Sequence, residues 1–206
     1  MKIECVFPAH GDRIPIDHNY PLYAALSALV PAFHDAGSHL RFATLTGEPD
    51  GDGHLRLTEH SCLRVRLMDD AIRTILPLAG KRLEIAGHPV RLGVPSVRTL
   101  IPAPRLFARI VTFKDADTPD SFLTTARKKL AEIGIAGEAE LPIHLVGERA
   151  GEPQRKIVRI KGIAIVGYSL LVSELTANDS LSLQEQSLGG RTQMGCGYFV
   201  PIKEVA

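Results

Sequence analysis

The same succession of strand-like and helix-like segments occurs twice along this chain of 206 residues. This repeat constrains the fold more than any other feature of the sequence. In each half, alternating apolar residues predict strands, and apolar residues three or four positions apart predict helices. The order in both halves is strand, helix, strand, strand, helix, strand, which is the pattern of a ferredoxin-like domain. The sequence therefore predicts an α+β protein with two tandem ferredoxin-like (β-α-β-β-α-β) domains.

Local signals set the expected boundaries of these domains. We predict an N-terminal domain over residues 1–94, a proline-rich linker over residues 95–104, and a C-terminal domain over residues 105–206. The first strand, around Ile3, is expected at the edge of its sheet, and a helix is expected between Asn19 and Pro31. In the second domain, a strand is expected over residues 141–146, and Asn178 is expected to cap the last helix.

The composition indicates the cellular compartment and limits the classes of partner that we expect. Cys5, Cys62 and Cys196 are odd in number and far apart, which argues against a disulfide framework and indicates a reducing cytoplasm. We find no secretory signal and no apolar run of roughly 18 residues, so a cytoplasmic protein without a membrane partner is expected. The net charge of +1 gives no overall signature of nucleic-acid binding, so a prediction of such binding depends on local basic clusters.

A glycine-rich segment, residues 188–197, lies between the last predicted helix and the last predicted strand. Glycine lets a backbone turn sharply and approach a ligand closely. Free N–H groups in such a loop, together with the charge of Arg191, predict an anion site that suits phosphate. The alternative is a flexible surface loop before an edge strand. The segment has neither the Walker ending nor the dinucleotide-binding arrangement.

This segment, continued by Tyr198 and Phe199, resembles the C-terminal glycine-rich loop of the CRISPR-associated repeat-RNA endoribonucleases. These enzymes belong to the repeat-associated mysterious protein superfamily and cut the long CRISPR transcript into guide RNAs. The segments 17–23 and 33–42 also resemble that family, and its compact myxobacterial-type branch is the most similar. The resemblance implies two ferredoxin-like domains, the first with a catalytic histidine and the second with an RNA-binding surface.

The resemblance also assigns candidate catalytic residues in the first domain. His34, which follows an aromatic residue and precedes an acid, matches the family's general acid/base histidine. Ser27 aligns with a tyrosine that some members use, and Tyr23 lies one helical turn earlier. His39 stands where a lysine would be, although a surface histidine at a strand start is an equal alternative. His18, beside the helix start, is interpreted as structural.

The implied reaction is metal-independent RNA cleavage by general acid–base catalysis. A ribose 2′-hydroxyl attacks the adjacent phosphorus, leaving a 2′,3′-cyclic phosphate and a 5′-hydroxyl. Histidine suits the proton transfers because its unperturbed pKa, about 6.5, lies near working pH. No histidine or cysteine pair has the spacing of a metal site, so we expect neither a metal nor another cofactor.

The expected RNA-binding residues fall into two groups, and the expected partner is CRISPR repeat RNA, with its guide-RNA product. Other CRISPR effector subunits are further candidate partners, and the oligomeric state is open. Residues of the glycine-rich loop form the first group, and basic residues around a predicted hairpin form the second: Gly189, Gly190, Arg191, Gln193, Gly195 and Gly197; Arg155, Lys156, Arg159 and Lys161.

Two other functions are compatible with the sequence. The first is a non-catalytic subunit that holds guide RNA in a CRISPR effector complex, because the superfamily uses the same domains and loop for that purpose. The second is a tandem ferredoxin-like sensor of a small molecule, which no ligand motif supports. The setting of His34 favours the enzyme over both.

Overall fold

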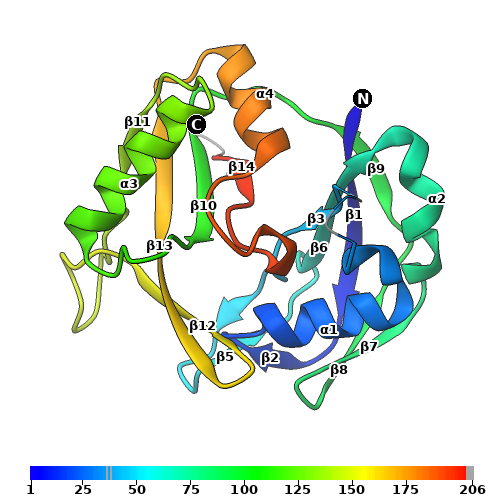
Figure 1. The fold of residues 1–206 in the computed structure, drawn as a ribbon. Coiled ribbons are helices and arrows are strands. Elements are labelled where there is room, and N and C mark those ends of the chain that lie inside the picture. The colour runs from blue at the N-terminus through cyan, green and yellow to red at the C-terminus, as the bar shows by residue number, and fades with distance from the viewer. Residues whose placement is uncertain (36, 38, 203–206) are drawn as a thin grey trace. The chain divides into compact units, whose positions relative to one another are not determined.

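A computed structural model describes residues 1–35, 37 and 39–202 of the chain (Figure 1). The chain divides into two compact units. Unit 1 comprises residues Met1–Thr99 with Gln193–Gly195, and unit 2 comprises Leu100–Thr192 with Cys196–Ala206. The division after Thr99 falls inside the segment predicted as a linker, and residues 203–206 of the predicted second domain lie outside the described residues.

Unit 1 is built on an antiparallel sheet with strand order β3-β6-β1-β8-β7, in which β9 also pairs with β1. A second, smaller sheet has the order β2-β5-β4. The strands are β1 (Lys2–His10), β2 (Arg13–Pro15), β3 (Arg41–Phe42), β4 (Glu48–Pro49), β5 (His54–Arg56), β6 (Cys62–Met68), β7 (Arg82–Ile85), β8 (His88–Leu92) and β9 (Ser96–Thr99). The helical elements are α1 (Asn19–Leu29), η1 (Pro31–Phe33), η3 (Asp69–Ala71), α2 (Ile72–Ile75) and η4 (Leu76–Leu78).

The structure corrects the expected place of the first strand. β1 is a central strand, because β6 pairs along one side of it while β9 and β8 pair along the other. Consecutive residues from Ile3 to Phe7 are buried, so both faces of the strand are covered there, and Glu4 is as well buried as the apolar residues beside it. The short strand β9 also shows that part of the predicted linker belongs to the sheet of unit 1.

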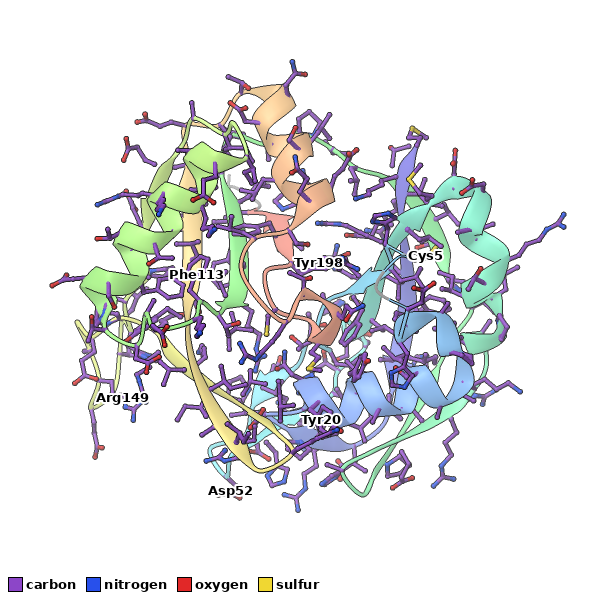
Figure 2. All side chains as sticks on the ribbon, in the orientation of Figure 1. Cys5, Tyr20, Asp52, Phe113, Arg149 and Tyr198 are labelled. Atoms are coloured by element: carbon purple, nitrogen blue, oxygen red, sulfur yellow. The ribbon has the colours of Figure 1, made fainter. Side chains whose placement is uncertain are left out.

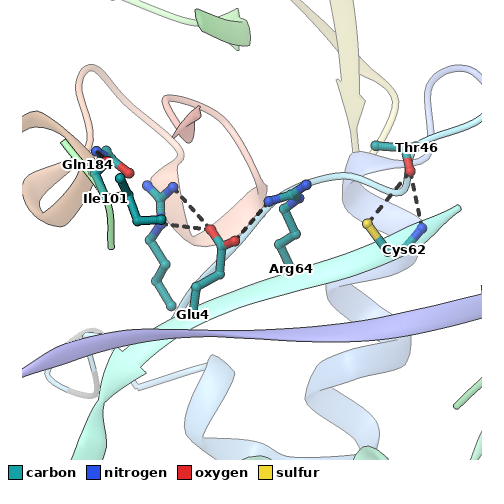
Figure 3. Close-up of polar contacts among 7 residues, drawn as sticks. Glu4, Thr46, Cys62, Arg64, Ile101 and Gln184 are labelled. Atoms are coloured by element: carbon teal, nitrogen blue, oxygen red, sulfur yellow. Dashed lines mark hydrogen bonds and ion pairs between the residues drawn. The ribbon is translucent and has the colours of Figure 1, made fainter. Parts of the chain in front are cut away.

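Burial of Glu4 is compensated by two arginines of the neighbouring strand β6 (Figure 3). Arg64 Nη1 donates to Glu4 Oε2 at 2.8 Å, and Arg66 Nε donates to Glu4 Oε1 at 3.1 Å. Arg66 is itself only 3% exposed. A charge removed from water is costly unless it is paired and hydrogen-bonded. Glu4 and the two arginines therefore compensate one another's burial, and their contacts hold β1 against β6.

Unit 2 is built on an antiparallel sheet with strand order β11-β13-β10-β14, in which β12 also pairs with β13. The strands are β10 (Leu106–Val111), β11 (Glu138–Glu140), β12 (Arg155–Ile160), β13 (Ile163–Ser173) and β14 (Phe199–Pro201), and the helical elements are α3 (Pro119–Glu132), α4 (Ala177–Gln186) and η5 (Thr192–Met194). Figure 1 shows α3 lying along this sheet.

Two local expectations for unit 2 are wrong. Thr176 caps α4 instead of Asn178, because its side chain accepts a hydrogen bond from the Asp179 N–H at 3.1 Å. The strand expected over residues 141–146 is displaced to β11, and the later residues contribute isolated bridges at Ile143 and His144.

The two units nevertheless share one topology. In each, the second, third, first and fourth strands of the pattern lie in that order: β3-β6-β1-β8 in unit 1 and β11-β13-β10-β14 in unit 2. This order, with two helical connections per unit, is the ferredoxin-like arrangement. The predicted fold class is confirmed. No helix in the described part of the chain is long and apolar enough to cross a membrane.

Candidate active site and nucleic-acid interface

Tyr23 and His34 form the most specific polar contact of unit 1. Tyr23 lies on α1, and its hydroxyl is 2.7 Å from His34 Nδ1. The rings meet edge to face, with centroids 5.1 Å apart and an interplanar angle of 81°. Tyr23 is 8% exposed, whereas His34 is exposed. The hydrogen bond occupies Nδ1, so Nε2 is the nitrogen that His34 offers to a substrate.

The sequence explains why these two residues meet. Apolar residues such as Leu22 and Leu26 hold α1 in the core of unit 1, and Pro31 prevents the helix from continuing. The chain then forms the short turn η1, in which the His34 N–H donates to Pro31 O at 2.8 Å. This turn carries His34 back beside the helix, next to Tyr23.

The Tyr23–His34 hydrogen bond is compatible with both protonation roles of a catalytic histidine. When the ring is protonated, Nδ1–H donates to the phenolic oxygen and Nε2–H can act as an acid. When Nδ1–H donates to the phenolic oxygen, Nε2 of the neutral ring has a lone pair and can act as a base. One fixed ring orientation thus serves proton donation and proton acceptance.

The other residues proposed for catalysis lie in different settings. Ser27 is 3% exposed and its hydroxyl is buried without a hydrogen-bond partner among the described residues, so it has little surface with which to contact RNA. His39 is exposed and adopts a positive φ of 54°. His18 is fully buried, and its Nδ1 is 2.8 Å from the Pro15 carbonyl, which fits a structural role. Roles for Ser27 and His39 stay predictions.

A short part of the glycine-rich loop belongs to unit 1. Asn19 Nδ2 donates to Met194 O at 2.8 Å, across 175 residues of sequence. Gly195 has a φ of +77°, and a Cβ there would stand 3.0 Å from the Phe42 ring. This part of the loop therefore packs closely on α1 and β3. Asn19 was not singled out from the sequence, because nothing in a helix-start asparagine indicates so distant an acceptor.

The remaining loop glycines pack against β10 of unit 2. A Cβ at Gly189 would lie 2.7 Å from Thr112 O, and one at Gly197 would collide with Leu188 O. The Gly190 N–H donates to Thr112 O and the Gly197 N–H donates to Ile110 O, each at 2.8 Å. The expected anion cradle of free N–H groups is therefore wrong at Gly190 and Gly197, whose donors serve the fold. Arg191, which is exposed, is the loop's cation.

The predicted basic hairpin is present as β12 and β13. These strands pair from Arg155↔Tyr168 to Ile160↔Ile163, and the turn consists of Lys161 and Gly162, both with positive φ. Successive side chains of a strand point to opposite faces. Arg155 and Arg159 therefore share the exposed face, while Lys156 lies on the face that carries the buried Val158. The hairpin offers its cations on two faces instead of one.

Lys156 stands in a cationic environment that the sequence did not reveal. Burial, and then the charges of Arg109 and Arg149, lower the pKa of Lys156 below its usual value. Arg149 lies on the loop between β11 and β12 (Figure 2). Like charges near a half-buried lysine are unfavourable unless an anion joins them. This cluster is suited to a phosphate group.

Comparison with known proteins assigns the family. The model of the Cas6 CRISPR family matches residues 3–204. The chain belongs to the Cas6 family. A curated relative, the "CRISPR-associated endonuclease Cas6" of Myxococcus xanthus (strain DK1622), is 39% identical over 199 residues, covering 97% of this chain and 81% of the relative. This result confirms the predicted family.

Solved structures of Cas6 proteins have the same fold. One titled "CRISPR associated protein Cas6" aligns with a TM-score of 0.67 at 14% identity, covering 98% of this chain and 99% of its own. Another, titled "An RAMP protein binding different RNA substrates", aligns with a TM-score of 0.62 at 14% identity, covering 98% of this chain and 100% of its own. At this identity the similarity establishes the Cas6 fold alone, so the site of this chain depends on its own residues.

Among the described residues, no three histidine, cysteine, aspartate or glutamate side chains stand close enough together to hold a metal ion. The three cysteines are buried, and none forms a disulfide bond in the described part of the chain. His34 has an exposed ring that can transfer a proton, and exposed arginines such as Arg155 and Arg191 can bind an anion.

Proposed function

We propose that this Cas6 family chain is an endoribonuclease that cuts CRISPR repeat RNA into guide RNAs without a metal ion. The observation that carries the proposal is the Tyr23–His34 pair, in which a buried tyrosine orients an exposed histidine through a 2.7 Å hydrogen bond. Its curated relative at 39% identity carries the name of a CRISPR-associated endonuclease, which agrees with this activity. The proposed place of action is the cytoplasm.

In the proposed reaction, the 2′-hydroxyl of the ribose before the scissile bond attacks the phosphorus. The new P–O bond closes a 2′,3′-cyclic phosphate, and the bond to the 5′-oxygen of the next nucleotide breaks. His34 Nε2 accepts the 2′-hydroxyl proton or delivers a proton to the leaving 5′-oxygen. Tyr23 fixes the ring for either transfer. His39, in its protonated form, is the proposed helper for charge on the phosphorane.

Positive side chains of unit 2 are proposed to hold the RNA. Arg155 and Arg159 on the exposed face of β12 and Lys161 in its turn contact the phosphate backbone, and Arg191 adds a contact from the glycine-rich loop. On the other face of β12, Lys156 binds a further phosphate together with Arg109 and Arg149. Gly189, Gly190, Gln193, Gly195 and Gly197 shape the loop that presents Arg191. Other CRISPR effector subunits stay predicted partners.

The test is to incubate the purified protein with its repeat RNA in EDTA and to analyse the ends of the products. The expected result is a single cut, a 2′,3′-cyclic phosphate and a 5′-hydroxyl. Loss of cleavage in EDTA that magnesium restores would contradict the proposed chemistry. Tight RNA binding without cleavage under any condition would instead support the alternative, a non-catalytic guide-RNA-binding subunit.

A further inference from the structure

The outer edge of the sheet in unit 1 ends in a strand whose charges alternate. β7 is the last strand of the order β3-β6-β1-β8-β7, so one of its sides pairs with no strand in the described part of the chain (Figure 1). Its exposed residues are Arg82 and Glu84, and Leu83 between them is buried. Neither charged side chain takes part in a hydrogen bond or ion pair among the described residues.

The register of the β7–β8 hairpin shows which backbone groups face outward. The Leu92 N–H donates to Lys81 O at 2.8 Å, which makes residues 81 and 92 a hydrogen-bonded pair. Hydrogen-bonded and non-hydrogen-bonded pairs alternate along an antiparallel ladder. Arg82 and Glu84 therefore direct their N–H and C=O groups away from β8. Pro89, which has no N–H, lies opposite Glu84, as a non-hydrogen-bonded position allows.

We propose that this edge binds the same edge of a second copy of the protein, so that two units 1 share one continuous antiparallel sheet. A twofold axis through Leu83 places Arg82 of each copy opposite Glu84 of the other. Those are the residues whose backbone groups face outward, so each pair exchanges two hydrogen bonds. The same pairs join opposite charges on one face of the sheet. A shift of this register by one residue removes both the backbone hydrogen-bond pairing and the pairing of opposite charges.

The surface beside β7 suits a second copy as well. A groove of about 490 Å³ lies between β7 and α1. On the helix it is lined mainly by small side chains, Ala24, Ala25 and Ala28, and by Leu29, which is 39% exposed. In the twofold arrangement, the α1 helix of the second copy lies on the same side of the shared sheet. Small residues let two helices approach closely, and their contact removes exposed apolar surface from water.

The charge pattern distinguishes self-pairing from ordinary edge protection. Natural sheets use charged residues to prevent edge-to-edge association. An edge with charges of one sign repels its own copy, whereas a positive and a negative residue two positions apart attract it in the antiparallel orientation. The opposite edge of the same sheet is β3, which has two residues and offers a much shorter ladder.

The test measures self-association without RNA, by sedimentation velocity over a series of protein concentrations. The wild type is expected to form a dimer. Arg82→Glu and Glu84→Arg should each weaken it by roughly tenfold or more, because one reversal turns two attractive cross-strand pairs into two repulsive pairs. Arg73→Glu on the exposed side of α2 makes the same charge change and should leave the dimer intact.

Two rescue experiments make the test specific. A chain with both Arg82→Glu and Glu84→Arg keeps opposite charges facing each other, so the dimer should return. A mixture of the two single variants should form a mixed dimer, because one copy then presents two negative residues and the other two positive ones. A wild type that stays monomeric, single variants that dimerise like the wild type, or a mixture that fails to associate would each overturn the proposal. Cleavage activity does not enter these measurements, so they stand apart from the proposed function.

Discussion

Units 1 and 2 have the same strand order but carry different chemistry. Every histidine except His144 lies in unit 1, which holds the Tyr23–His34 pair. Unit 2 instead presents the cationic hairpin of β12 and β13 and the cluster around Lys156. Under the proposed function, one ferredoxin-like scaffold serves proton transfer and the other serves phosphate binding. The topology permits both uses, and the residues placed on it decide between them.

The first helix of each unit shows how small the local difference is. In unit 1, Pro31 after α1 forms a tight turn that returns His34 to the helix. In unit 2, α3 ends near Gly134, which has a φ of 73°, and the chain continues toward β11. A proline turn in one case and a glycine turn in the other determine whether the residues after the helix approach it again.

The largest expected effect concerns the catalytic side of this comparison. His34→Ala should lower the single-turnover cleavage rate by roughly 10²–10⁴-fold, because it removes the group that moves protons in the transition state. Affinity for repeat RNA should stay near that of the wild type. His39→Ala is the matched control. It should lower the cleavage rate less, since water or a neighbouring cation can replace a side chain that only stabilises charge. Cleavage by His34→Ala at the wild-type rate would exclude His34 as the catalytic residue.

The next effect concerns the glycines of the loop in unit 2. Gly197→Ala should lower the free energy of unfolding by about 2–4 kcal/mol, because its Cβ would collide with Leu188 O and its φ is +68°. Gly190→Ala is the control, since its Cβ would meet only Thr112 atoms at 3.6 Å. Thermal unfolding of both variants is the measurement. A Gly190→Ala variant of normal stability that binds RNA poorly would show direct approach of RNA to the loop backbone.

A smaller effect tests how Tyr23 supports His34. Tyr23→Phe keeps the ring contact and removes the hydrogen bond, so we expect a loss of roughly tenfold in cleavage rate. The pH dependence of the rate should change as well, which a purely structural role would not produce. Tyr20→Phe on the same helix is the control, and its rate should match the wild type. An unchanged rate and pH profile in Tyr23→Phe would show that the hydrogen bond does not position the histidine.

The smallest effect is expected at Lys156, whose replacement should raise the stability of the protein but weaken RNA binding. A pKa of Lys156 below its usual 10.5 means that the folded state is penalised while the lysine is charged. Lys156→Met should therefore stabilise the protein slightly, on the order of 0.5 kcal/mol. The gain is present at neutral pH and shrinks as the pH rises through the folded-state pKa toward 10.5.

The same variant should bind RNA more weakly and flatten the salt dependence of binding by roughly one charge. Arg191→Ala should flatten the salt dependence similarly without the stabilisation, because Arg191 is exposed. Melting temperatures and filter binding at several salt concentrations distinguish these outcomes. A Lys156→Met variant with unchanged salt dependence would remove Lys156 from the RNA-binding surface.

The sequence predicted the elements better than their contacts. Periodicity and proline positions gave the extent of α1, and alternation gave the β12–β13 hairpin. Alignment of the helix with the family's tyrosine favoured Ser27, but the turn after α1 brings His34 to Tyr23, one helical turn earlier. Helical spacing shows which residues share a face, yet the path of the following turn decides which of them a later residue meets. The sequence could not predict that Arg109 and Arg149 lie near Lys156 for a similar reason, because they come from a separate strand and a separate loop.

The membership of Gln193–Gly195 in unit 1 has a consequence for synthesis on the ribosome. A nascent chain of residues 1–99 contains Tyr23 and His34, but Asn19 still lacks the Met194 carbonyl as an acceptor. Unit 1 is therefore completed only after residues 100–192 of unit 2 have been translated. Expression of residues 1–99 alone should give a less stable unit than the full chain contains. Adding a peptide that spans residues 188–198 should restore part of the difference.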